Sequence, residues 1–109
     1  MALAYKVLGQ SNPSITTATT LYTVPAATST IISTLAICNQ AATATTFRVA
    51  VRPAGATLAA LHYLNYDTAL PANDTITATL GITMAATDVL TVYAGSATVS
   101  FTAFGSELT

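Results

Sequence analysis

The stretch "TFRVAVRP", Thr46 to Pro53, decides the fold class of this chain. Every second residue is apolar, namely Phe47, Val49 and Val51, and between them lie Thr46, Arg48, Ala50 and Arg52. Successive side chains of a β-strand point to opposite faces, so one of these sets faces a core and the other faces outward. Pro53 and Gly55 then end the pattern. The stretch predicts a half-buried strand with both arginines on its outward face.

Similar runs recur along the chain, separated by Gly, Pro, Asn and Asp at spacings near ten. We expect about eight strands, including Leu3–Leu8, Ser29–Gln40, Leu61–Thr68, Asn73–Gly81 and a hairpin of Val89–Ala94 with Ala97–Phe104. Phe101, Ile76, Ala78 and Leu80 are expected to point inward. The segment Gln10–Thr20 reads as a loop or arm, Ala56–Leu61 as one helical turn, and residues 82–88 as a bend. The pattern is typical of a sandwich or barrel.

Composition limits the class of protein. The 109 residues correspond to one domain, residues 1–109, and the single Cys38 excludes an internal disulfide. Charged residues are only 6% of the chain, against about 25% in ordinary soluble domains. Three basic residues are too few for a nucleic-acid surface, and we expect neither a membrane span nor a signal peptide. A surface with so little charge favours association between copies.

Residues able to support catalysis are few. Cys38 and His62 are the one thiol–imidazole pair available, but Cys38 lies in an apolar run where an inert thiol is expected. His62, Asp67 and Asp74 match no metal-ligand spacing. Asp74 and Asp88 lie in turn contexts, where Asp is favoured for its backbone hydrogen bonds. We therefore predict no catalytic residues, no metal, no cofactor and no enzyme activity.

The chain resembles a group of small structural proteins of tailed bacteriophages. The marks of the resemblance are a Leu-Tyr-Thr-Val-Pro opening (Leu21 to Pro25), a long strand ending at Asn39, an arginine strand running into Pro-x-Gly (Arg48 to Gly55), and a Gly-x-Glu ending (Gly105 to Glu107). The resemblance covers nearly the whole chain. It implies a virion component, made in the host bacterial cytoplasm, with an antiparallel β-sandwich of immunoglobulin-like or jelly-roll-like type and an irregular N-terminal arm within residues 1–20.

Two virion roles fit this resemblance: a capsid cement or decoration protein, which we prefer, and a tail, baseplate or fibre-associated structural or host-adhesion module. The expected partners are copies of the chain, as a homotrimer or another symmetric oligomer, and other virion proteins such as the major capsid protein. Nucleic acid and membranes are not expected partners. The candidate interface residues are Arg48, Arg52, Tyr63, Tyr66 and Glu107. Glu107 is the first choice to pair with an arginine of a neighbouring copy, because a free C-terminus would let it reach.

Overall fold

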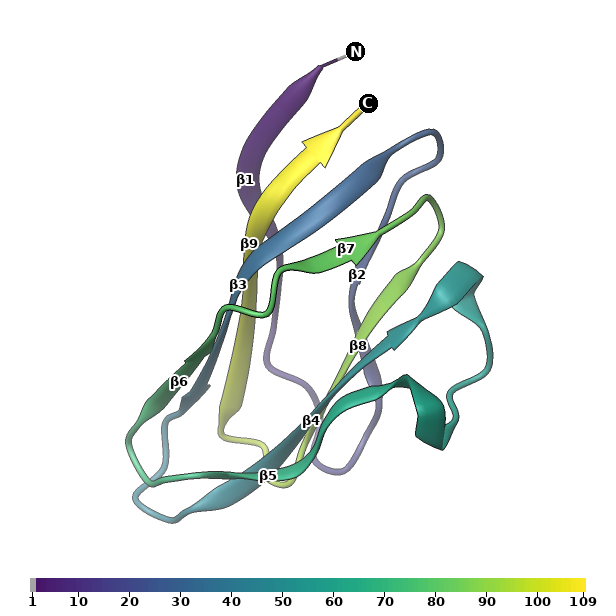
Figure 1. The fold of residues 1–109 in the computed structure, drawn as a ribbon. Helices are drawn as coiled ribbons and strands as arrows, with labels where there is room; N and C mark the ends of the chain where they lie inside the picture. The colour runs from purple at the N-terminus through teal and green to yellow at the C-terminus, as the bar shows by residue number, and fades with distance from the viewer. Residues whose placement is uncertain (1) are drawn as a thin grey trace.

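The computed structural model describes residues 2–109, which form two antiparallel β-sheets packed face to face (Figure 1). The strands are β1 (Leu3–Ser11), β2 (Thr19–Thr23), β3 (Ser29–Asn39), β4 (Thr45–Arg52), β5 (Tyr63–Leu70), β6 (Thr75–Ala78), β7 (Ile82–Met84), β8 (Val89–Ala94) and β9 (Val99–Leu108). Two short 3-10 turns, η1 (Pro53–Gly55) and η2 (Ala60–His62), lie between β4 and β5. The predicted antiparallel sandwich is confirmed, with nine strands among the described residues instead of about eight.

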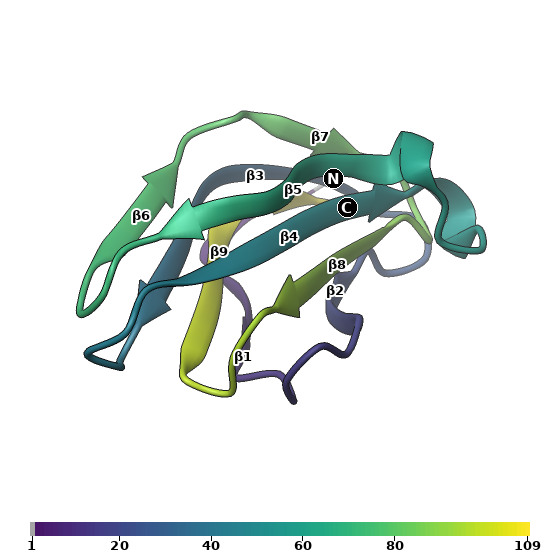
Figure 2. The same cartoon turned by 90° about the horizontal axis from the view of Figure 1, so that it is seen from below.

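The two sheets interleave along the chain. Sheet A has the order β1-β9-β3-β6, with β7 also paired to β3, and sheet B has the order β2-β8-β4-β5. Figure 2 shows the two layers from below. All connections except β4 to β5 and β6 to β7 cross from one sheet to the other. Each face of the core is therefore built by residues far apart in sequence.

The core lies between the inner faces of both sheets. Phe47 of β4 and Phe101 of β9 meet there edge to face, with ring centroids 6.4 Å apart. Phe47, Val49 and Phe101 are fully buried and Val51 is partly buried, as the alternation predicts. The aromatic pair links the two sheets through the kind of edge-to-face contact that aromatic rings prefer.

The segment after Asn73 differs from the prediction. The expected strand Asn73–Gly81 ends at Ala78, and Leu80 is exposed instead of inward. Gly81, three residues after the end of the strand, has a φ of +63°, a conformation that redirects the chain before Ile82. Ile82–Met84, expected to be part of a bend, then forms β7 and pairs with residues 30–32, because β6 pairs only with residues 35–38 of the longer β3.

The N-terminal residues are more regular than predicted. Strand β1 pairs with β9 from Leu3 opposite Leu108 to Ser11 opposite Phe101. The irregular segment is therefore limited to residues 12–18, and residues 3–11 are not a free arm. At Gly9 the chain passes so close to β2 that a Cβ atom there would lie 2.3 Å from the Leu21 carbonyl oxygen. The absence of a side chain at Gly9 allows β1 and β2 to approach along this side of the sandwich.

Asn39, one of the marks of the resemblance, ties together one end of the sandwich. It is buried at the end of β3, and its Nδ2 donates to the carbonyls of Thr43 (2.9 Å) and Pro71 (3.2 Å). Its Oδ1 accepts from the Ala41 amide and the Thr98 hydroxyl, both at 3.1 Å. These four bonds hold together the loops β3–β4, β5–β6 and β8–β9, so one side chain satisfies polar groups from three of the loops that pass between the sheets.

Candidate interaction surfaces

Arg48, Tyr63 and Tyr66, three of the predicted interface residues, lie together on the outer face of sheet B. The Arg48 guanidinium carbon is 4.0 Å from the centroid of the Tyr66 ring, 4.2 Å from that of Tyr93 and 6.0 Å from that of Tyr63. Tyr63 and Tyr66 meet edge to face at 4.9 Å. A guanidinium over aromatic faces is held by cation–π attraction, so Arg48 is fixed by its neighbours on β5 and β8.

A bulge in β5 gives this cluster its acid. Phe47 pairs with Thr68 and Val49 pairs with Asn65, so two residues, Tyr66 and Asp67, lie opposite Arg48. Asp67 has a φ of +49°, in the left-handed region that Asp tolerates better than most residues. The bulge turns both side chains toward Arg48. The carboxylate of Asp67 then accepts from Arg48 Nε at 2.7 Å and from an Arg48 terminal nitrogen at 3.2 Å.

The charge of Arg48 is thus paired within its own chain. The hydrogen bond with Asp67 is the main reason why the pKa of Arg48 is raised above its ordinary value. Sequence reasoning did not identify Asp67 as the partner of Arg48, because a bulge cannot be inferred from an alternating pattern. The feature of the sequence that could have indicated the Arg48–Asp67 pair is the stretch Tyr63–Tyr66 with an acid directly after it.

Arg52 lies on the same face of β4 but has a different role. Its Nε donates to the Thr91 hydroxyl at 3.0 Å, and a terminal nitrogen donates to the carbonyls of Gly55 (3.3 Å) and Ala56 (2.9 Å). These carbonyls belong to the last residue of the turn η1 and to the residue after it, and within the turn Ala54 and Gly55 both have positive φ. Arg52 therefore holds the chain that leaves β4, and the two arginines do not form one site.

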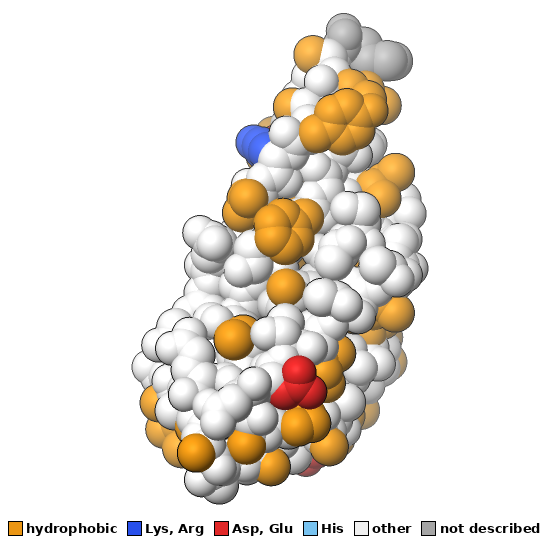
Figure 3. Space-filling model, turned by 90° about the vertical axis from the view of Figure 1, so that its left-hand side faces the viewer, with side chains coloured by type: hydrophobic (Ala, Val, Ile, Leu, Met, Phe, Trp, Pro, Cys, Tyr) orange, Lys and Arg blue, Asp and Glu red, His pale blue; other side chains and the backbone are white. Residues whose placement is uncertain are grey.

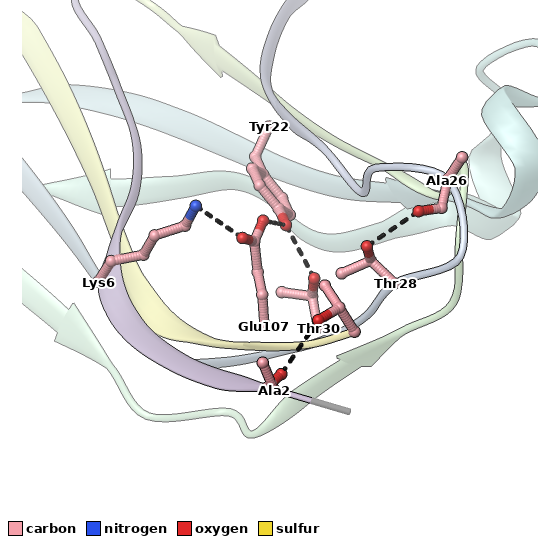
Figure 4. A network of polar contacts seen from close by, with 8 residues as sticks. Ala2, Lys6, Tyr22, Ala26, Thr28, Thr30 and Glu107 are labelled. Carbon is pink, nitrogen blue, oxygen red and sulfur yellow. Dashed lines mark hydrogen bonds and ion pairs between the residues drawn. The ribbon is translucent and has the colours of Figure 1, made fainter.

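Glu107 lies far from this cluster, on the inner side of sheet A, and the expectation of a free C-terminal segment is wrong. Strand β9 runs between β1 and β3, which holds Glu107 inside the sandwich at 8% exposure. Its carboxylate binds Lys6 Nζ at 2.6 Å and accepts a hydrogen bond from the Tyr22 hydroxyl (Figure 4). Glu107 therefore makes its ion pair and its hydrogen bond within its own chain, and it is not placed to reach an arginine of a neighbouring copy.

The network around Glu107 shifts the titration of its members. Hydrogen bonds from Lys6 and then from Tyr22 hold the pKa of Glu107 below its ordinary value, against the opposing effect of burial. Burial, followed by the hydrogen bond to Glu107, raises the pKa of Tyr22 to about 12. The Tyr22 oxygen also lies 2.8 Å from the Thr30 hydroxyl. Because the Tyr22 proton is given to the carboxylate, Thr30 donates to Tyr22.

A shallow groove adjoins the arginine cluster. Leu58, Ala59, Ala60, Tyr63 and Tyr66 line it, between the segment after η1 and the start of β5. The groove is apolar apart from the tyrosine hydroxyls and backbone groups, and it is open to solvent. The predicted interface role of Tyr63 and Tyr66 stays a prediction, now placed on a defined surface.

A second surface, which the sequence analysis missed, covers the outer side of sheet A. Six exposed apolar side chains, here called the apolar face, lie on β1, β3 and β9: Leu3, Tyr5, Val7, Ile31, Phe104 and Leu108. Leu3 lies opposite Leu108, and Val7 opposite Phe104, while Tyr5 and Ile31 both lie opposite Ser106. In Figure 3 the large orange side chains over the upper half of the molecule mark this region.

The signal for the apolar face was present in the sequence but ambiguous. Leu3, Tyr5 and Val7 alternate with Ala4 and Lys6 just as Phe47, Val49 and Val51 alternate with polar residues. Alternation alone says that two faces differ, and the usual assignment places the apolar one inward. In β1 the inward positions are instead those of Lys6 and Gly9, because they face Glu107 and the β2 backbone.

The residues weighed for catalysis are separated in the fold. Cys38 is half-buried on β3 of sheet A, whereas His62 lies in η2 beside sheet B. His62 is buried, and its Nδ1 accepts a hydrogen bond from the Ala59 amide at 3.0 Å. Asp88 accepts from the amides of Ala54 and Ala85, both at 2.9 Å, which is the turn role predicted for it. Within residues 2–109, no three His, Cys, Asp or Glu side chains gather as a metal site would require.

Comparisons with known proteins identify no relative of this chain. No protein-family model, no curated protein and no solved structure matches it. In the part of the chain that the structure describes, no helix has the length and apolar character needed to cross a membrane.

Proposed function

We propose that the chain is a non-enzymatic structural component of a bacteriophage virion, a capsid cement or decoration protein that binds copies of itself and other virion proteins such as the major capsid protein. The phage assignment rests on the sequence resemblance. The observation that carries the structural role is the apolar face, a set of exposed apolar side chains on a chain with only seven charged residues, three basic and four acidic. Exposed apolar surface of this kind marks sites of protein association.

The marks of the resemblance have structural explanations in this fold, which supports a building-block role. Asn39 connects three crossings between the sheets. Gly105 lies against β3 so closely that a Cβ atom would be 2.0 Å from the Ile31 carbonyl oxygen. Glu107 anchors Lys6 and Tyr22. These two marks stabilise strand order and sheet packing, which suits a protein whose shape serves assembly.

The electrostatics of the surface favour the same role. Arg48 and Lys6 are paired with Asp67 and Glu107 of the same chain. With these pairs neutralised, little net charge is left to repel a second copy or to select a highly charged ligand. Contacts made by such a surface depend on shape and apolar area, which suits a protein that is added to a symmetric shell.

The test is the number of copies in purified particles of the phage that encodes the chain, measured by quantitative mass spectrometry with labelled peptides. A cement or decoration protein is expected in hundreds of copies for each particle. A handful to a few dozen copies would favour the tail or baseplate role in its place. Absence of the chain from particles that are otherwise complete would refute a virion role of either kind.

A further inference from the structure

We infer that the apolar face is the site where two copies of the chain pack together, with the outer side of one sheet A against that of the other. This inference names the partner for the proposed assembly role. It rests on the proposed function only for the place of the paired copies in a virion. The occupant of the face is thus a second copy of this chain.

The register of the strands places the six apolar side chains on one continuous surface. On β1 and β9 the pairs Leu3–Leu108 and Val7–Phe104 are directly opposite each other. Between them Tyr5 lies opposite Ser106, which on its other side lies opposite Ile31 of β3. Side chains of directly paired residues in antiparallel strands share a face and lie side by side. The apolar face therefore spans three adjacent strands, with the small polar side chain of Ser106 between Tyr5 and Ile31.

The area of this surface is sufficient for a specific contact. The exposed fractions are 53% for Leu3, 79% for Tyr5, 49% for Val7 and for Ile31, 39% for Phe104 and 38% for Leu108. With a full exposure of about 150–250 Å² for each large side chain, the six present roughly 600 Å². This is the upper end of apolar patches on monomeric proteins. Two such faces packed together bury roughly 1,200 Å², the lower end of specific interfaces.

The charge pattern favours a second copy over a charged partner. The outward positions of β1 and β9 alternate with the inward ones, and they carry Leu3, Tyr5, Val7, Ser100, Thr102, Phe104, Ser106 and Leu108. None of these side chains is charged, and Lys6 of β1 turns inward to Glu107. Two identical uncharged faces can meet about a two-fold axis without like-charge repulsion, and the same patch then serves on both copies. An acidic or basic partner would find no opposite charge on this surface.

The backbone beneath the face is already ordered, which reduces the entropy lost on association. Strand β9 pairs with β1 along eight residue pairs and with β3 along ten. Gly105 fixes the spacing at the centre, where β9 approaches the Ile31 carbonyl. A surface that needs no reordering keeps more of its contact energy as affinity.

The experiment is sedimentation velocity on the purified full chain over roughly 1 to 100 µM, the affinity range of modest interfaces. The unsubstituted chain is expected to show a reversible monomer–dimer equilibrium. Tyr5→Glu places a charge at the centre of the contact and should weaken the dimer at least ten-fold. The matched control is Leu61→Glu, since Leu61 is 84% exposed but lies in η2, away from the apolar face. Far-UV circular dichroism checks that each variant keeps the fold.

Three results would overturn the inference: a monomer over the whole range, Tyr5→Glu dimers as tight as those of the unsubstituted chain, or equal weakening by Leu61→Glu. The number of copies in each virion distinguishes a failure of the self-pairing inference from a failure of the proposed virion role. A chain that is monomeric in solution yet abundant in virions, and lost from them on Tyr5→Glu substitution, would refute self-pairing and assign the face to another virion protein. A dimer broken by Tyr5→Glu in a chain absent from virions would uphold the inference and refute the virion role.

Discussion

Replacing Tyr22 with Phe should destabilise the fold strongly although it removes a single oxygen atom. The Tyr22 side chain is 8% exposed, and its hydroxyl joins Thr30 on one side to Glu107 on the other. The substitution removes a hydrogen bond to a buried carboxylate, worth about 1.5–3 kcal/mol, and leaves the Thr30 hydroxyl, on a residue 1% exposed, without its acceptor. We expect a loss of about 2–3 kcal/mol in the free energy of unfolding at pH 7.

The assay is urea unfolding followed by far-UV circular dichroism, because the chain has no tryptophan. With a urea dependence of roughly 1.5 kcal/mol/M, the midpoint should fall by about 1.3–2 M. The control is Tyr5→Phe, which removes the same atom from a side chain that is 79% exposed. That variant should stay within about 0.5 kcal/mol of the unsubstituted chain.

The pH dependence provides a second, independent readout. The pKa of Glu107 is held below its ordinary value of 4.5, so the stability from its ionised form is present above that value and is lost as the pH falls through the folded-state pKa. The pKa of Tyr22 is raised from 10.0 to about 12, so its contribution is present below pH 10 and is lost as the pH rises toward 12. The difference between the chain and Tyr22→Phe should therefore be largest from about pH 5 to 9 and shrink on both sides.

Either of two findings would refute this reasoning. One is a Tyr22→Phe protein that unfolds within 0.5 kcal/mol of the unsubstituted chain at pH 7, which would mean that the hydroxyl is readily solvated. The other is a difference between the two proteins that stays constant while Glu107 becomes protonated at low pH, which would mean that the bond does not depend on an ionised Glu107.

Four further substitutions test two glycine positions and two side chains that hold connections between strands. Gly105→Ala should lower the free energy of unfolding by about 3 kcal/mol, because the new Cβ atom would lie 2.0 Å from the Ile31 carbonyl oxygen and force β9 away from β3. Its control is Gly81→Ala, where there is open space but a φ of +63°. That substitution should lower the free energy of unfolding by only about 1 kcal/mol in the same urea assay. Asn39→Ala should lower the free energy of unfolding by about 2–4 kcal/mol, since four hydrogen bonds end on this buried side chain; a loss under 1 kcal/mol would show that water replaces them. Asp88→Ala should cost about 1–2 kcal/mol because two turn amides lose their acceptor, and a thermal midpoint equal to that of the unsubstituted chain would contradict this role.

Much of the fold could be predicted from local pattern. The period of two in "TFRVAVRP" buries Phe47 and Val49, as observed, but on the outward face Arg48 and Arg52 are half-buried and Ala50 is buried. The predicted Ser29–Gln40 strand is observed as Ser29–Asn39. These predictions succeed because side-chain parity along an extended backbone depends only on neighbouring residues. The prediction for Leu80 fails because the strand ends before it, at Ala78, and the chain then turns at Gly81, which has a positive φ.

The candidate site could be predicted only in part. The sequence indicated Arg48 and the nearby tyrosines, but Asp67 reaches Arg48 through a bulge in β5, and a bulge depends on how two distant strands pair. Glu107 was chosen as a mobile partner because it lies near the C-terminus. Its partners Lys6 and Tyr22 come from the other end of the chain, and only the position of β9 between β1 and β3 brings them to it.

The apolar face shows most clearly where local pattern ends and tertiary structure begins. The sequence by itself determined that Leu3, Tyr5 and Val7 share one side of a strand, just as Phe47, Val49 and Val51 do. Tertiary structure alone decided that the second set, on β4 of sheet B, is covered by sheet A, whereas the first set, on the outer side of sheet A, is left exposed. The physical reason is that alternation distinguishes the two faces of a strand, whereas burial depends on which of those faces meets the other sheet. That meeting is set by strand order and by the crossings between sheets, which join residues at opposite ends of the chain.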